Sequence, residues 1–259
     1  MKTDLLIIDP QNSFCDPKGE LYVKNADIDM FRLSEMIVKN QDKISNIRVT
    51  LDSHHYIHIA HPIWWQDKND ISPKPFTVIK SEDVTGDSPL WKARSSVFAK
   101  RSVEYVKALE AAGKVLCIWP PHCLIGSSGQ AIYECLFDAL IEWEKSQFNV
   151  ADKIVKGSNI FTEQYSVFSA EIPDNDDPDT LMNESLIKRL DEADRILVAG
   201  EALDFCVQES LKHAIQFIKP TKFVLLTDAM SAINTEAGEK FVAEMKAIGM
   251  HLSKTSVYF

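Results

Sequence analysis

Residues 195–210 read RILVAGEALDFCVQES, and this stretch contains the unit from which the fold is built. A short apolar run, 195–200, ends in Gly200 and is followed by a helical pattern, CVQESLKHAIQFI, that starts at Cys206. Such a run is typical of a buried parallel strand, and apolar residues at three- and four-residue spacing are typical of an amphipathic helix. The stretch therefore predicts one strand–helix unit with a cysteine where the helix begins.

The same alternation of apolar runs and helical patterns recurs along the chain. Five further runs predict strands: 4–9 (DLLIID), 46–52 (NIRVTLD), 114–119 (KVLCIW), 152–157 (DKIVKG) and 222–229 (KFVLLTDA). The helical patterns are 31–44, 103–113, 129–146, 184–193, 206–218 and 238–249. Apolar strands separated by amphipathic helices predict a three-layer α/β/α fold, with a mostly parallel sheet of about six strands covered on both faces.

The length of 259 residues favours a single domain, residues 1–259, with one long irregular excursion around residues 60–100. The net charge is −10, the isoelectric point is near 5.2, and lysines and arginines do not cluster. We therefore expect neither nucleic acid nor a membrane as a partner, and a homo-oligomer is left open. No stretch approaches the ~18 apolar residues of a membrane span, so we expect a cytoplasmic protein. The five cysteines lack CxxC spacing, which favours reduced thiols.

Three side chains at the ends of the predicted strands suit covalent catalysis. Asp9 ends the first run, Lys156 ends the run 152–157, and Cys206 follows the run 195–200. The carboxyl ends of parallel strands meet at one edge of a sheet, so we expect these groups to converge. A carboxylate can accept a thiol proton, a lysine can stabilise both anions, and a helix N-terminus can lower the pKa of Cys206. Each also has an ordinary interpretation, as a loop cap, a strand-end lysine or an inert buried cysteine.

A second group suits a metal ion. Asp52 and His54 are two apart on an extended chain and project on the same side, and His122 follows the run 114–119. Mixed carboxylate and imidazole ligands suit zinc, iron or manganese. The alternative interpretation is a solvated loop rich in histidine. Spacing leaves a further ligand open among water and three nearby histidines: His55, His58 and His61.

Aromatic residues lie near the same strand ends, namely Phe14, Trp119 and Tyr165. The usual fate of an aromatic side chain is core packing. Beside a metal ion and a thiol, the three together would suit a flat aromatic ligand.

Five motifs resemble, in chain order, those of the nicotinamidases within the isochorismatase-like cysteine hydrolases. They are IIDPQNSFC, LDSHHYIH, WPPHC, KGSNIFTEQYSVF and GEALDFCV. The resemblance implies that Asp9, Lys156 and Cys206 form a catalytic triad. It also implies one divalent metal ion, zinc before iron or manganese, with the ligands Asp52, His54 and His122.

The resemblance further implies a cis peptide bond between Glu201 and Ala202, and an oxyanion hole formed by the N–H groups of Ala202 and Cys206. The implied reaction is hydrolysis of nicotinamide to nicotinic acid and ammonia through a Cys206 thioester, a step of NAD salvage. Phe14, Trp119 and Tyr165 would contact the pyridine ring.

Three other functions are left open by the residues. One is a hydrolase of the same superfamily that acts on a different small amide or carbamoyl compound. Another is a zinc hydrolase in which the histidines hold a catalytic hydroxide. The third is a non-catalytic protein that binds a pyridine metabolite on the same fold.

Overall fold

The computed structural model describes all 259 residues and contains a six-stranded, fully parallel sheet. Its strands are β1 (Thr3–Ile8), β2 (Asn46–Asp52), β7 (Asp152–Lys156), β8 (Arg195–Gly200), β9 (Phe223–Leu226) and β10 (His251–Ser253). They lie in the order β10-β9-β8-β1-β2-β7. The chain runs outward from β1 in one direction and returns at β8 to run in the other, so the order reverses between β1 and β8. A crevice for ligands is expected at the carboxyl ends of these two strands.

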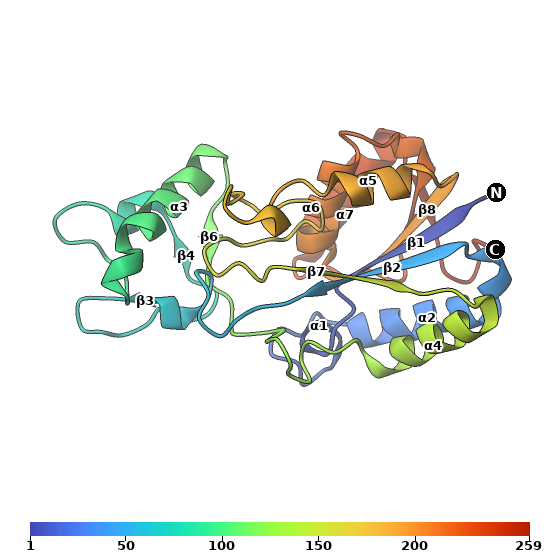
Figure 1. Ribbon diagram of the computed structural model, residues 1–259, viewed down its shortest axis with the longest axis horizontal. Helices are drawn as coiled ribbons and strands as arrows, with labels where there is room; N and C mark the ends of the chain where they lie inside the picture. The colour runs from blue at the N-terminus through green and yellow to red at the C-terminus, as the bar shows by residue number, and fades with distance from the viewer.

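Strand β1 is buried on both faces, because its successive side chains alternate between two cores. Leu5 and Ile7 pack in one core, and Leu6 and Ile8 pack in the other. Helices α2 (Ala26–Lys39) and α4 (Glu134–Gln147) cover the first face, and α5 (Glu184–Asp191), α6 (Gln208–Ala214) and α7 (Thr235–Ala247) cover the second (Figure 1). The predicted three-layer α/β/α fold is confirmed.

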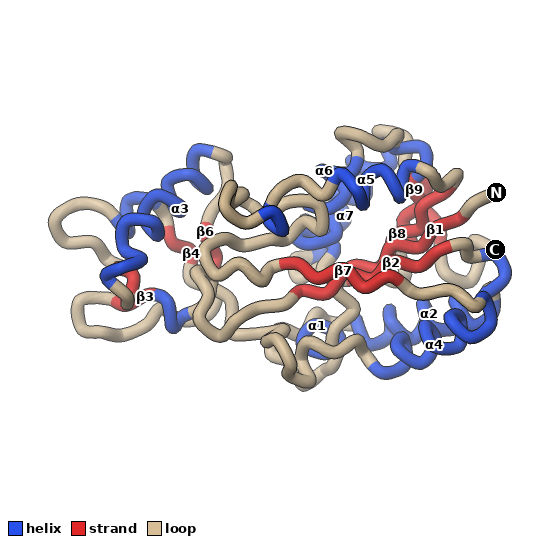
Figure 2. Tube along the Cα trace, viewed as in Figure 1, coloured by secondary structure: helices blue, strands red, loops and turns tan.

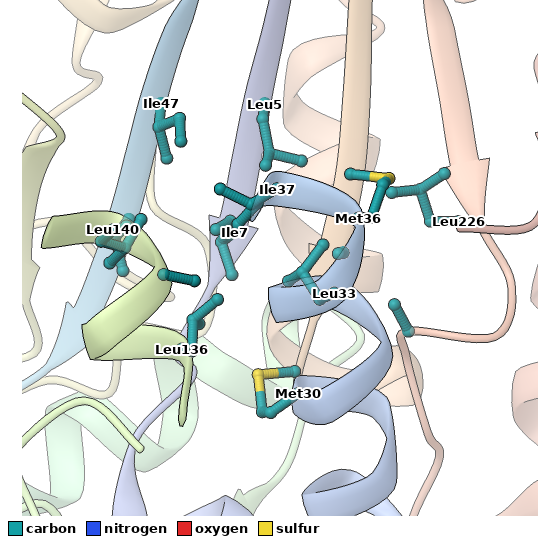
Figure 3. Packing of buried hydrophobic residues seen from close by; sticks show 14 of the residues in the cluster. Leu5, Ile7, Met30, Leu33, Met36, Ile37, Ile47, Leu136, Leu140 and Leu226 are labelled. Carbon is teal, nitrogen blue, oxygen red and sulfur yellow. The ribbon is translucent and has the colours of Figure 1, made fainter. Parts of the chain in front are cut away.

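Helix α2 shows how sequence spacing produces the packing. Its residues Met30, Leu33 and Ile37 are fully buried and recur at three- and four-residue intervals, so they form one apolar stripe. Figure 3 shows this stripe facing Leu5 and Ile7 of β1, with α4 alongside. No helix in the structure combines the length and apolar character needed to cross a membrane.

The excursion predicted around residues 60–100 belongs to a lobe beyond the carboxyl ends of the strands. The lobe contains α3 (Ala99–Ala111) and two short antiparallel pairs, β3 (Trp65–Gln66) with β5 (Lys92–Ala93) and β4 (Val78–Ile79) with β6 (Leu116–Cys117). It has its own cluster of 13 buried apolar residues, which extends from Ile59 to Trp119. Loops join these elements, and both chain termini lie at the opposite end of the molecule (Figures 1 and 2). That the whole chain is one domain stays a prediction.

One strand of the main sheet was predicted wrongly. The run 114–119 does not join the parallel sheet, because its central residues form β6 and pair with β4 in the lobe. Leu116 and Ile118 are buried whereas Val115 is 52% exposed, so the run has one apolar face. Such alternation is typical of a half-exposed antiparallel strand. The sixth strand is β10, whose sequence HLS has no apolar run that could have predicted it.

The core of α2 provides a test of this packing. Replacing the fully buried Leu33 with Ala should lower the free energy of unfolding by about 3 kcal/mol, because it leaves a cavity between α2 and the sheet. Replacing Val38, which lies on the same helix and is 49% exposed, with Ala should change it by less than about 0.5 kcal/mol. Urea denaturation of both variants measures the difference, and equal effects would contradict this assignment of the buried face.

Candidate active site

The carboxyl ends of four neighbouring strands place the predicted catalytic groups together around one buried lysine. The Lys156 Nζ atom, at the end of β7, lies 2.9 Å from Asp9 Oδ2 and 3.2 Å from Asp52 Oδ1. The same atom lies 3.6 Å from the Cys206 Sγ atom and donates a hydrogen bond to the Gln164 carbonyl oxygen at 2.9 Å. Lys156 is 3% exposed. The structure thus brings Asp9, Lys156 and Cys206 into one constellation.

The charges of this constellation follow from its contacts. Burial opposes a charge on Lys156, but Asp52 and Asp9 raise its pKa well above the usual value, so the amine is an ammonium ion. Burial also opposes ionisation of Asp52, but His54 and Lys156 hold the pKa of this carboxyl well below its usual value. Asp52 is therefore a carboxylate that pairs with both His54 and Lys156.

Asp9 has the geometry of a base. Its residue adopts a left-handed backbone conformation, with φ of 45°, directly after β1. Its N–H donates to Thr50 Oγ1 at 2.9 Å, and the same hydroxyl donates to Asp9 Oδ1. The other oxygen, Oδ2, makes no hydrogen bond of favourable angle although it lies beside Lys156, so it can accept a proton. Burial raises the pKa of Asp9, which increases its affinity for that proton.

The prediction of a lowered thiol pKa is wrong. Burial raises the pKa of Cys206 well above its usual value, although Lys156 opposes the change. The thiol lies inside a π-helical turn, Leu203–Val207, which runs directly into α6 at Gln208, and this position does not offset the effect of burial. A neighbouring base must therefore remove the proton before Cys206 can act as a nucleophile.

The backbone before Cys206 leaves one N–H group free. The Glu201–Ala202 peptide bond is cis, as the resemblance implied. The Ala202 carbonyl oxygen accepts hydrogen bonds from the N–H groups of Phe205 and Val207, at 3.1 and 3.2 Å. The Ala202 N–H has no acceptor in the protein, and Ala202 lines the same small cavity as Cys206. Gly200 is required before this turn, because a Cβ there would lie 2.0 Å from the Ile8 carbonyl oxygen.

The three predicted metal ligands also converge. One donor atom from each of Asp52, His54 and His122 lies within 4.8 Å of the other two. The Nε2 atoms of His54 and His122 lie 2.9 and 3.3 Å from Asp52 Oδ2. Against the effect of burial, Asp52 raises the pKa of His54 to about 9, and a negative field that favours a proton there also favours a metal cation.

The orientation of each imidazole fits metal binding. The Nδ1 atoms of His54 and His122 lie 3.0 and 2.8 Å from the carbonyl oxygens of Gly157 and Pro120. A carbonyl oxygen only accepts, so each Nδ1 carries the proton and donates it. The Nε2 atoms are left to face Asp52 as ligands.

Two nearby histidines differ in what they can bind. Both ring nitrogens of His58 are used, since Nε2 donates to the Thr162 carbonyl oxygen and Nδ1 accepts from the Ala60 N–H. His58 thus has no free lone pair, although it lies within ligand distance of His54 and Glu163. His61 donates from Nδ1 to the Tyr56 carbonyl oxygen, and its buried Nε2 has no partner.

The unpartnered Nε2 of His61 is therefore a bare lone pair. Burial lowers the pKa of His61 to about 3, so the ring is neutral, which is the form that binds metals. Its ring lies 5.5 Å from that of His54 and 5.9 Å from that of His122. This orphaned nitrogen beside three ligand-type side chains fits a bound cation.

The predicted aromatic residues line a small cavity between the thiol and the histidines. Phe14, Trp119 and Tyr165 all border this cavity of about 30 Å³, together with His122 and Cys206. The Trp119 indole N–H donates to the Tyr165 hydroxyl at 3.0 Å, which holds one wall in place. The space admits roughly one water molecule.

Sequence reasoning missed several residues of the site. The Gln11 side chain binds both backbone groups of Asp52. The Gln11 Nε2 donates to the Asp52 carbonyl oxygen, and the Gln11 Oε1 accepts from the Asp52 N–H, each at 2.7 Å. Gln11 follows Asp9 closely, so its position was a usable signal. Nothing in the sequence distinguishes Thr50 from other strand threonines. The missed cavity residues include Leu21, Val23, Glu163, Phe205 and Ile233.

Gly157 provides a test of the metal site. A Cβ at residue 157 would lie 2.7 Å from Asp52 Oδ1 and 3.0 Å from His54 Cε1, and φ is +81°. Gly157→Ala should therefore lower zinc affinity by about 10-fold or more, because it displaces two ligands. Gly86→Ala is the control. Gly86 has φ of +85°, and a Cβ there would have no atom within 4 Å, so this variant has the backbone strain without a steric clash.

Backbone strain should cost both variants about 1 to 2 kcal/mol of stability, and the contact with Asp52 should add to the loss in Gly157→Ala. Only Gly157→Ala should lose zinc, as measured by calorimetric titration of the metal-free proteins. Equal zinc affinity in the two variants would contradict the proposed ligand set.

No protein-family model and no curated protein sequence matches this chain. Solved structures do. The chain is 20% identical to the yeast nicotinamidase bound to the inhibitor nicotinaldehyde, with a TM-score of 0.66, and the alignment covers 98% of this chain and 100% of that chain. A nicotinamidase and pyrazinamidase of Acinetobacter baumanii is 21% identical, with a TM-score of 0.65 and coverage of 100% and 98%.

A third match is the pyrazinamidase of Pyrococcus horikoshii in complex with zinc. It is 20% identical, with a TM-score of 0.59, and the alignment covers 98% of this chain and 99% of that chain. All three matches extend over nearly the whole of both chains. The chain therefore has the fold of the solved nicotinamidase and pyrazinamidase structures.

Proposed function

We propose that this protein is a metal-dependent cysteine amidohydrolase that converts nicotinamide to nicotinic acid and ammonia, as a cytoplasmic step of NAD salvage. The observation that carries the proposal is the contact of one buried ammonium, Lys156, with Asp9, Asp52 and Cys206. A protein that only binds a metabolite has no use for a base, a thiol and a bridging lysine together. The ligands of the solved neighbours, nicotinaldehyde in one and zinc in another, agree with this substrate and cofactor.

The residues present fit one divalent metal ion. Asp52, His54 and His122 would hold it, and the bare lone pair of His61 favours His61 over His58 as a further ligand. Such an ion would supply an open coordination position for the pyridine nitrogen of nicotinamide. Zinc suits this mixture of one carboxylate and imidazoles, and iron and manganese are alternatives.

The aromatic side chains bind the ring. Phe14 and Trp119 would contact its two faces, and Tyr165 would hold Trp119 through their hydrogen bond. A ring bound by these side chains would have its carboxamide near Cys206, which lines the same cavity.

The first half of the reaction begins with proton transfer. Asp9 Oδ2 takes the thiol proton of Cys206, and Lys156 stabilises the resulting thiolate. The sulfur attacks the carboxamide carbon, and the N–H groups of Ala202 and Cys206 stabilise the negative oxygen. Asp9 then donates its proton to the amine, the C–N bond breaks, and ammonia departs. A thioester with Cys206 remains.

The second half returns the enzyme to its starting state. Asp9, again a carboxylate, takes a proton from a water molecule that attacks the thioester carbon. The C–S bond breaks, the sulfur regains a proton, and nicotinic acid is released. One carboxyl group thus serves as base and acid in both halves.

The nucleophile is tested by ammonia release from nicotinamide. Cys206→Ala should lower kcat by about a thousandfold or more, because no other nucleophile replaces the thiol. Cys117→Ala removes a thiol that lies outside the small cavity and should retain activity within about twofold. Ammonia release by Cys206→Ala at the wild-type rate would favour a metal-bound hydroxide instead.

The role of the metal is tested by the ring nitrogen of the substrate. Benzamide lacks this nitrogen, so its kcat/KM should be about 100-fold or more below that of nicotinamide. Chelation should abolish nicotinamide turnover, and added zinc should restore it. Equal turnover of the two amides, or activity that resists chelation, would favour a hydrolase that acts on another small amide or carbamoyl compound.

A further inference from the structure

Glu201 is a buried acid for which the proposed reaction has no use. It follows β8 directly, is 0% exposed, and one of its oxygens, Oε1, has no hydrogen-bond partner. No basic side chain forms an ion pair with it. Placing an unpaired carboxyl group in the interior is costly, so its contacts call for an explanation.

The other oxygen of Glu201 binds the loop around Ser231, which contacts the π-helical turn that contains Cys206, Leu203–Val207. Glu201 Oε2 accepts the N–H of Ser231 at 3.0 Å. The Ser231 carbonyl oxygen accepts the N–H of Leu203 at 2.8 Å. Ser231 is thus bonded to the residues on both sides of Ala202, and these two bonds bracket the residue whose N–H is free.

A second carboxyl group completes this connection. The Ser231 hydroxyl donates to Asp29 Oδ2 on α2, and Asp29 Oδ1 lies 3.3 Å from Arg32. The Glu201 N–H donates to the Ile8 carbonyl oxygen at 2.8 Å, directly before Asp9. Glu201 therefore links the ends of β1 and β8 to the Ser231 loop and, through it, to α2.

We propose that Glu201 is a positioning residue: its carboxyl side chain holds Ser231, and Ser231 holds Leu203, so that the Ala202 N–H stays directed at the oxygen of the reacting carbonyl. The inference rests on the proposed function, in which that oxygen becomes negative during attack by Cys206. An apolar residue at position 201 would leave the Ser231 N–H without its acceptor and would free the loop to shift.

The ionisable groups around Glu201 determine its protonation state. The groups that face it are Asp29 on α2, Asp204 in the π-helical turn Leu203–Val207, and Cys15, the last residue of α1 (Asn12–Cys15). Burial, followed by the negative charge of Asp29, raises the pKa of Glu201 well above its usual value, which favours the neutral form of the side chain. Glutamine is therefore the matched substitute, because it keeps the acceptor oxygen and the neutral charge.

Two ligands distinguish a positioning role of Glu201 from general damage to the fold. Pyridine-3-carbaldehyde reacts with a thiolate to give a tetrahedral adduct with a negative oxygen, which needs the Ala202 N–H. Nicotinate binds without forming that adduct. Glu201→Met should lower kcat and aldehyde affinity by about 10-fold or more, with nicotinate affinity changed less than about threefold. Glu201→Gln should restore both quantities to within about threefold of wild type.

Asp4→Asn is the control, because Asp4 is a buried acid at the other end of β1 that pairs with Arg48. It should leave the ratio of aldehyde to nicotinate affinity unchanged. A Glu201→Met protein with wild-type kcat and aldehyde affinity would overturn the proposal, as would equal losses for both ligands. A wild-type protein that releases no ammonia from nicotinamide would instead refute the proposed function.

If Glu201→Met does not fold, Glu201→Ala provides the second variant. It removes the acceptor of the Ser231 N–H without placing a long apolar side chain at this position. A loss of aldehyde affinity of about 10-fold or more, with nicotinate affinity changed less than about threefold, supports the proposal. An unchanged aldehyde affinity contradicts it.

The raised pKa of Glu201 also predicts a pH dependence of stability. An acid whose pKa is raised by folding loses stability as the pH rises above its unfolded pKa, about 4.3 for glutamate. The Tm of the wild type should therefore fall more between pH 5 and pH 8 than the Tm of Glu201→Gln, which lacks this group. An equal fall in the two proteins would contradict a raised pKa of Glu201.

Discussion

The buried ammonium of Lys156 is the contact on which the site depends. Asp52 and Lys156 are direct neighbours in the parallel register of β2 and β7, and Asp9 directly follows the adjacent β1. Moving an ammonium ion into the interior costs several kcal/mol unless anions surround it, and here two carboxylates do. Because side chains alternate along a strand, a slip of one residue in β7 would turn Lys156 to the other face. Sheet register therefore determines whether the catalytic groups meet.

Asp52 connects Lys156, which contacts the Cys206 thiol, to the proposed metal ligands. Its Oδ1 atom contacts Lys156, and its Oδ2 atom contacts His54 and His122. A cation held at Oδ2 would draw negative charge away from Oδ1, so the ammonium would act more strongly on Asp9 and Cys206. The proposed nucleophile and the proposed metal site thus share one carboxylate, so a change at one site should alter the charge at the other.

The sequence predicted what depends on strand ends and missed what depends on burial. Asp9, Lys156 and the Asp52–His54 pair were found because the carboxyl ends of parallel strands converge. The direction of the Cys206 pKa was wrong, since burial and the π-helical turn cannot be read from residue spacing. The run 114–119 was misplaced because an extended apolar run does not specify its partner strand. Spacing also could not separate His61 from His58, whose hydrogen bonds differ only in the folded chain.

Covalent catalysis by Cys206 is the central claim, and hydroxylamine trapping tests it most directly. Hydroxylamine competes with water for a thioester even when the thioester does not accumulate. Nicotinamide and methyl nicotinate should give the same ratio of hydroxamate to nicotinate, because both would pass through the same acyl group on Cys206. Different ratios for the two substrates, or no hydroxamate from either, would contradict a shared thioester and point to direct attack by water.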